Sequence, residues 1–114
     1  MEYLALIHAD ENGWESLSDD ERQAIYQRYM EFSQKPEVVG GAELQSTNAA
    51  TTVRVRNGDQ LVTDGPYAET KETLGGFFIL DCDSIDAACR LAAEIPAAER
   101  GAIEVRPVYV REES

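Results

Sequence analysis

Two short segments of this chain are apolar on both of their alternating faces, and no other feature constrains the fold as strongly. Residues 3–9 read YLALIHA, and residues 76–81 read GFFILD. Both lengths are typical of β-strands, and a strand that is apolar on both faces belongs in a sheet that is covered on both sides. We therefore expect each segment to be a buried strand of such a sheet.

A first helix is predicted over residues 19–34. The stretch SDDE at residues 18–21 fits a capping box, in which serine and glutamate side chains each accept a hydrogen bond from the other residue's amide. Pro36 disfavours helical conformation at the residue before it, so the helix ends nearby. The apolar stripe expected to face the core consists of Ile25, Tyr26, Tyr29, Met30 and Phe32.

A second helix follows the strand at residues 76–81. Either Asp83 or Ser84 can cap it, and Pro96 ends it. Its apolar stripe consists of Ile85, Ala88, Leu91, Ala92 and Ile95. Two helices cover only one face of a sheet, so the second face needs a further partner.

A β-hairpin is the clearest local signal. Asn57-Gly58 joins TTVRVR at residues 51–56 to residues 59–63, and this dipeptide supplies both positive φ angles of a type I′ turn. Residues 38–44 are a weaker strand interrupted by glycines. Residues 102–110 are predicted to be the last strand, and Pro107 suggests that this strand lies at a sheet edge.

The order of these elements predicts an α+β fold in a single domain over residues 1–114. Strand, helix, two strands, helix and strand form the ferredoxin-like βαββαβ plan, here with the hairpin inserted in the middle. A second copy packed face to face would cover the open side of the sheet, giving a homodimer. The alternative is a monomer whose hairpin folds over that side.

The charge balance excludes two classes of partner. The chain has 22 acidic against 10 basic residues and a formal net charge of −12, so its surface repels phosphate backbones and anionic lipids. We expect no nucleic-acid partner and no membrane partner. Residues 1–14 lack the basic segment of a signal peptide, so we expect a cytoplasmic protein.

The two cysteines, Cys82 and Cys89, indicate neither a disulfide framework nor a metal site. They lack a Cys-x-x-Cys spacing, and no histidine cluster accompanies them. We interpret both as buried thiols and expect neither a metal nor a cofactor.

A charged loop between the hairpin and the strand at residues 76–81 is the first candidate for function. Asp64-Gly65-Pro66-Tyr67 is a turn sequence, and Glu69, Lys71 and Glu72 follow it at once. Loops on a rigid sheet often carry binding residues. A solvated charged loop is the simpler alternative.

The only histidine, His8, lies in line with Leu4 and Leu6 on the first strand. A histidine can serve as general acid or base near neutral pH if a carboxylate such as Asp64 orients it. A hydrogen-bonded core histidine is the alternative. We therefore assign Asp64 and His8 as candidate catalytic residues.

Arg54 and Arg56 share one face of the hairpin and could bind a carboxylate. A two-residue turn places Arg56 opposite Asp59, and it puts Asp64 on the other face beside Val53 and Val62. An exposed pair between Arg56 and Asp59 is the simple interpretation of these charges. The candidate ligand-binding residues are Arg54, Tyr67, Glu69 and Lys71.

Three stretches together resemble a known family. DGPYAETKETLGGFFIL at residues 64–80, YLALIHADE at residues 3–11 and EVRPV at residues 104–108 are similar to the DGPF subgroup of the YCII-related family, with Tyr67 where phenylalanine is usual. The resemblance implies a ferredoxin-like protomer in a dimeric α+β barrel, with a site in a cleft. It also implies a His-Asp active centre, but the family's histidine lies on the first helix, where this chain has none.

Two functions follow from the resemblance and the charged residues. One is a small enzyme, a lyase or hydrolase that acts on a small aromatic or anionic molecule, because one branch of the family is similar to a dehydrochlorinase of a chlorinated hydroxyquinol. The other is a non-catalytic dimeric module, because DGPF proteins resemble partners of extracytoplasmic-function sigma factors. The sequence leaves open whether the chain is an enzyme.

Overall fold

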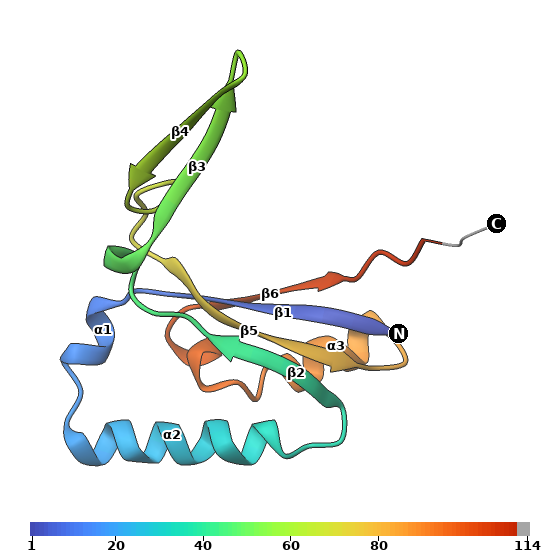
Figure 1. Cartoon of the computed structure of the whole chain (residues 1–114). Helices are drawn as coiled ribbons and strands as arrows, with labels where there is room; N and C mark the ends of the chain where they lie inside the picture. Colours follow the sequence, from blue (N-terminus) through green and yellow to red (C-terminus); the bar gives the residue numbers. More distant parts are fainter. Residues whose placement is uncertain (112–114) are drawn as a thin grey trace.

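The computed structural model describes residues 1–111 as an α+β protein, as predicted; residues 112–114 of the predicted domain lie outside the described residues. Figure 1 shows its elements in space. In chain order they are β1 (Glu2–Ala9), α1 (Asn12–Glu15), α2 (Asp19–Ser33), β2 (Val38–Glu43), η1 (Thr47–Ala49), β3 (Thr51–Arg56), β4 (Asp59–Asp64), β5 (Thr73–Asp81), α3 (Ile85–Ala92), η2 (Pro96–Glu99) and β6 (Ala102–Pro107). None of the helices within residues 1–111 has the length and hydrophobicity to cross a membrane.

The main sheet has four antiparallel strands in the order β2-β5-β1-β6. The two strands that are apolar on both faces, β1 and β5, are therefore its central strands. In the register, Ala5 pairs with Phe78 on one side and with Val105 on the other. The weak strand at residues 38–44 is confirmed as β2, with an irregularity between Val38 and Gly40.

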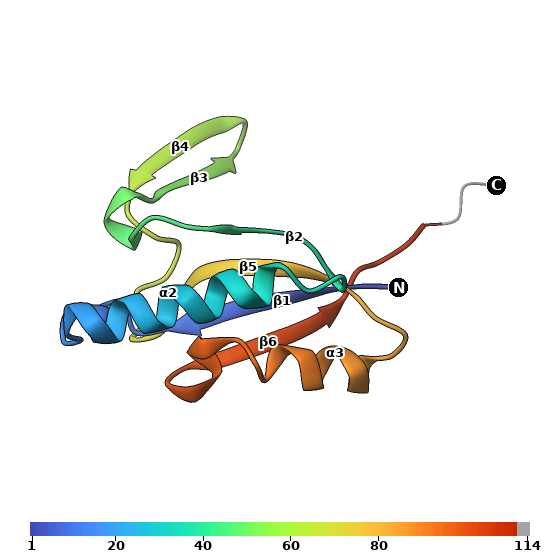
Figure 2. The ribbon, with the colours of Figure 1, turned by 90° about the horizontal axis from the view of Figure 1, so that it is seen from below.

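The core lies on one face of this sheet. Helices α2 and α3 both cover that face, as Figures 1 and 2 show. The buried side chains that form it are Tyr3, Ala5, Phe32, Leu80, Cys82, Ala88, Leu91, Ala92 and Ile95. Because neighbouring side chains on a strand alternate between faces, Leu4, Leu6, Phe77 and Ile79 lie on the opposite face, which we call the open face.

Both helix starts agree with the sequence predictions. The Ser18 hydroxyl accepts from the Glu21 amide at 3.1 Å, and the Glu21 carboxylate accepts from the Ser18 amide at 3.1 Å. At the start of α3 the cap is Ser84, whose hydroxyl accepts from Ala87. Ion pairs of Arg28 with Glu99 and of Lys35 with Glu94 link α2 to the segment that follows α3.

The α2 stripe is narrower than predicted. Phe32 is buried against Phe78 with 4.9 Å between ring centroids, but Tyr26 and Met30 are exposed. Tyr26 instead packs edge-on against Trp14 of α1, a short helix that was not predicted from the sequence. The Trp14 contact therefore replaces the core contact expected of Tyr26.

The hairpin β3–β4 forms as predicted but stands apart from the main sheet. Asn57 and Gly58 have φ angles of 53° and 83°, and Arg56 pairs with Asp59. The two strands form a separate sheet that projects on the side of the main sheet away from α2 and α3 (Figure 1). We call this hairpin the arm. It does not fold over the open face.

The arm gives the chain an extended shape. The radius of gyration is 16.5 Å, and the principal extents are 50 × 46 × 18 Å. A compact domain of this length has a radius of gyration of about 13 Å.

Three local predictions were wrong. The last strand ends at Pro107 rather than at residue 110, because Pro107 pairs with Tyr3 and almost no β1 residues remain to pair beyond it. Cys89 is exposed while Cys82 is buried, because only Cys82 faces the core. Ile85 is exposed at the first turn of α3. The predicted edge position of Pro107 is confirmed, since β6 is an edge strand.

Leu80 tests the position of the core. Its side chain is fully buried, so we expect Leu80→Ala to lower the free energy of unfolding by about 2–5 kcal/mol. The matched control Leu44→Ala removes an exposed side chain and should cost less than about 1 kcal/mol. Chemical denaturation measures both. Equal losses would contradict the placement of the core.

Candidate functional site

A cleft of about 630 Å³ lies where β1 ends and where β5 and β6 begin. The register explains this position. His8 pairs with Leu74 of β5 and with Ala102 of β6, so the residues just beyond these pairs converge at one end of the three strands. The residues that line the cleft are Asp10, Thr70, Lys71, Glu72 and Arg100.

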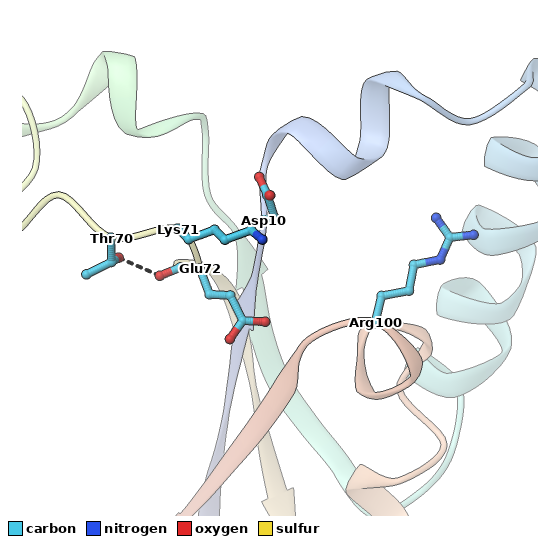
Figure 3. A pocket seen from close by; sticks show the side chains of 5 residues that line it. All are labelled: Asp10, Thr70, Lys71, Glu72 and Arg100. Carbon is cyan, nitrogen blue, oxygen red and sulfur yellow. Dashed lines mark hydrogen bonds between the residues drawn. The ribbon is translucent and has the colours of Figure 1, made fainter.

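The cleft combines two cations with two carboxylates. Figure 3 shows Lys71 and Glu72 on one side of Asp10 and Arg100 on the other. Within residues 1–111, neither Lys71 nor Arg100 forms an ion pair. The chain has 10 basic residues, and two of them line this one cleft. They are suited to bind an anionic group.

Backbone contacts hold the lining residues in place. The Asp10 carboxylate accepts from the Asn12 amide at 2.9 Å, and the Thr70 hydroxyl donates to the Glu72 carbonyl. A β-carbon at Gly101 would overlap the carbonyl oxygen of His8. Glycine is therefore required at this position, and the close approach of the two backbones holds Arg100 beside the end of β1.

Glu11 fixes the base of the arm next to the cleft. Its carboxylate accepts from the Thr47 amide at 2.7 Å, from the Thr47 hydroxyl at 3.0 Å and from the Ser46 hydroxyl at 3.3 Å. These bonds favour the charged carboxylate, so they lower the pKa of Glu11, with the Thr47 amide as the largest cause. The Glu11 carboxylate thus links the end of β1 to the segment that leads into β3.

His8 lies on the open face, in line with Leu4 and Leu6 as the sequence predicted. Its Nε2 atom is 3.4 Å from Oε1 of Glu104 on the neighbouring strand β6. The carboxylate beside this imidazole is thus that of Glu104. Both side chains are partly exposed, so the pair can exchange protons with a bound molecule or with water.

The other predicted site residues lie on or near the arm. Asp64 pairs with Thr51 and is exposed on the face of Val53 and Val62, as the predicted register requires. The Arg54 guanidinium lies over the exposed Tyr67 ring, with 5.7 Å from its carbon to the ring centroid. Glu69 is also exposed.

Arg56 differs from the simple interpretation. It pairs with Asp59 across the hairpin, but its guanidinium donates to the Val55 carbonyl at 2.9 Å. No ion pair joins Arg56 to Asp59 among the residues that the structure describes.

Of the predicted site residues, the structure brings Lys71 into the cleft. Asp10, Thr70 and Arg100 were not predicted as site residues, and Glu72 was noted only as part of the charged loop; the four come from three separate segments. Their meeting could have been predicted, because each of these segments lies next to the end of a predicted strand of the same sheet. Within residues 1–111, no three His, Cys, Asp or Glu side chains are arranged to hold a metal ion.

The fold and the cleft define an α+β protein with a charged site at one end of an antiparallel sheet. Residues 1–112 match the model of the YCII-related domain, and the chain belongs to this family. It is also 39% identical over 118 aligned residues to the uncharacterized protein R00369 of Rhizobium meliloti (strain 1021). That alignment covers 95% of this chain and 92% of the relative.

Replacement of Glu11 should give a pH-dependent loss of stability. The folded-state pKa of Glu11 is lowered, so its contribution is present above the ordinary value of 4.5 and is lost as the pH falls through the folded-state pKa. We expect Glu11→Gln to be less stable than the wild type at pH 7, with a difference that narrows below pH 4.5. Urea denaturation at pH 7 and near pH 3 measures it, and a difference that widens in acid would contradict the bonding of Glu11.

Asp64 should be dispensable for folding. Its side chain is exposed and makes no hydrogen bond or ion pair within residues 1–111, so we expect Asp64→Asn to cost less than about 1 kcal/mol of unfolding free energy. Thermal and chemical denaturation check this value. A large loss would assign Asp64 a structural role and remove it from the candidate catalytic residues.

Proposed function

We propose that the protein is a homodimer of ferredoxin-like protomers in the DGPF subgroup, arranged as an α+β barrel. The sheet order β2-β5-β1-β6, with α2 and α3 in the two crossover connections, supports the ferredoxin-like plan. The turn Asp64-Gly65-Pro66-Tyr67 supports the subgroup. The open face supports the dimer, because two such faces packed together would remove four large apolar side chains of each protomer from water.

In this proposal the cleft binds a small anionic molecule. The observation that carries it is the pair of cations, Lys71 and Arg100, which flank Asp10 without an ion pair of their own in residues 1–111 (Figure 3). A carboxylate or phosphate between them would gain charge-assisted hydrogen bonds. Asp10 and Glu72 would select molecules that also carry a hydrogen-bond donor or a positive charge.

The reaction class that fits this site is a lyase or hydrolase reaction by acid/base chemistry. His8 precedes Asp10 by two residues, a separation of about 7 Å along a strand. Glu104 is the neighbouring carboxylate that can orient the imidazole and stabilise its protonated form. His8 would then take a proton from the bound molecule or from water, while Lys71 and Arg100 hold its anionic group.

A non-catalytic dimeric module, acting as an accessory of an extracytoplasmic-function sigma factor, is the second candidate function. The observation that favours it is the arm, which exposes apolar side chains as protein-binding surfaces do. Turnover that depends on His8 would separate the enzyme from this module.

Ligand binding tests the role of the two cations. The wild type is first screened by thermal shift against inorganic phosphate and a panel of small aliphatic and aromatic carboxylates. The compound that stabilises it most serves as the probe. We expect Arg100→Gln and Lys71→Gln each to weaken binding of that probe at least about tenfold, because each removes a charge-assisted hydrogen bond.

Arg90→Gln is the matched control, since it removes the same charge from α3, outside the cleft. It should leave the affinity within about twofold of the wild type. Equal weakening in all three variants would mean a general effect of net charge and would contradict a specific site. Unchanged affinity in Arg100→Gln and Lys71→Gln would contradict it as well.

A further inference from the structure

We propose that the arm β3–β4 packs against a second copy of this chain, through the face that carries Val53, Val55 and Val62. This inference rests on the proposed dimer and adds to it a contact outside the open face. It assigns a role to the hairpin that neither the cleft nor the open face explains.

The arm is an incomplete structure by itself. Val53, Val55 and Val62 are 59%, 61% and 56% exposed, and the register places Val53 opposite Val62 on one face. A two-stranded hairpin without a covering layer is marginally stable in water. Three valines in water on such a hairpin therefore indicate that another surface covers them.

Polar contacts hold the arm away from its own sheet. The Gly65 amide donates to the Ala50 carbonyl at 2.8 Å, and the Thr52 hydroxyl donates to the Gly65 carbonyl at 2.9 Å. Glu11 binds Thr47 just before β3. These bonds close the base of the hairpin and tie it to the end of β1, so its direction is fixed rather than free.

That direction places the arm on the side of the open face. Figure 1 shows α2 and α3 on one side of the main sheet and the arm on the other. A second copy that covers the open face would therefore meet the arm. Because a two-fold axis repeats each contact, both arms would be buried by the same association.

The charge distribution favours a second copy over other occupants. The chain carries a net charge of −12, so two copies repel each other over most of their surfaces. Along residues 51–64, however, Arg54 and Arg56 balance Asp59 and Asp64. Both arginines lie on the face opposite the valines, so they offset the acidic charge of the arm without occupying the proposed contact.

Two neighbouring substitutions on β4 test the contact. Val62→Glu puts a carboxylate on the proposed face, whereas Leu61→Glu adds the same charge to the opposite face, where Leu61 is 47% exposed. Both side chains are exposed in the protomer, so circular dichroism should show both variants folded. We expect Val62→Glu to raise the dimer dissociation constant at least about tenfold and Leu61→Glu to change it less than about threefold.

Sedimentation velocity gives the dissociation constants, and hydrogen exchange of the β3–β4 amides reports on the arm directly. We expect faster exchange in Val62→Glu and wild-type exchange in Leu61→Glu. If the wild type is a dimer, and the two variants have the same dissociation constant and the same amide exchange in the arm, this inference is overturned while the proposed dimer stands. A monomeric wild type would overturn both.

Discussion

The packing of α2 and α3 on a single face of the main sheet is the constraint on which the rest of the structure depends. That face buries Ala5 and Leu80 completely, and it supplies the core of the protomer. Because β1 and β5 alternate, the same packing leaves Leu4, Leu6, Phe77 and Ile79 on a face without a covering layer.

The cleft and the arm both follow from the ends of the same strands. At the end of β1, Asp10 borders the cleft, and the next residue, Glu11, binds the segment before β3. Two consecutive residues therefore belong to the cleft and to the base of the arm. A molecule in the cleft and a second copy at the arm would therefore lie close to the same turn. This proximity gives a physical reason for the charged loop, since Lys71 borders the cleft while Tyr67 stacks with Arg54 of the arm.

Features set by neighbouring residues could be predicted from the sequence, and features set by distant residues could not. The Ser18 cap, the Asn57-Gly58 turn and the central strands depend on local chemistry and appear as expected. The exposure of Tyr26 depends on Trp14, a contact that periodicity does not contain. The cleft needed the register of β1 with both β5 and β6, so Lys71 was found while Arg100 was missed.

The most direct test of the account is whether the open faces of two copies touch. A sample that mixes isotope-labelled with unlabelled protein allows nuclear Overhauser effects between copies to be selected. The account predicts effects between copies from the side chains of Leu6 and Phe77, and none from Leu80, which is buried within the protomer. The account is contradicted if nuclear Overhauser effects between copies do not involve Leu6 and Phe77. It is contradicted as well if no such effects are observed.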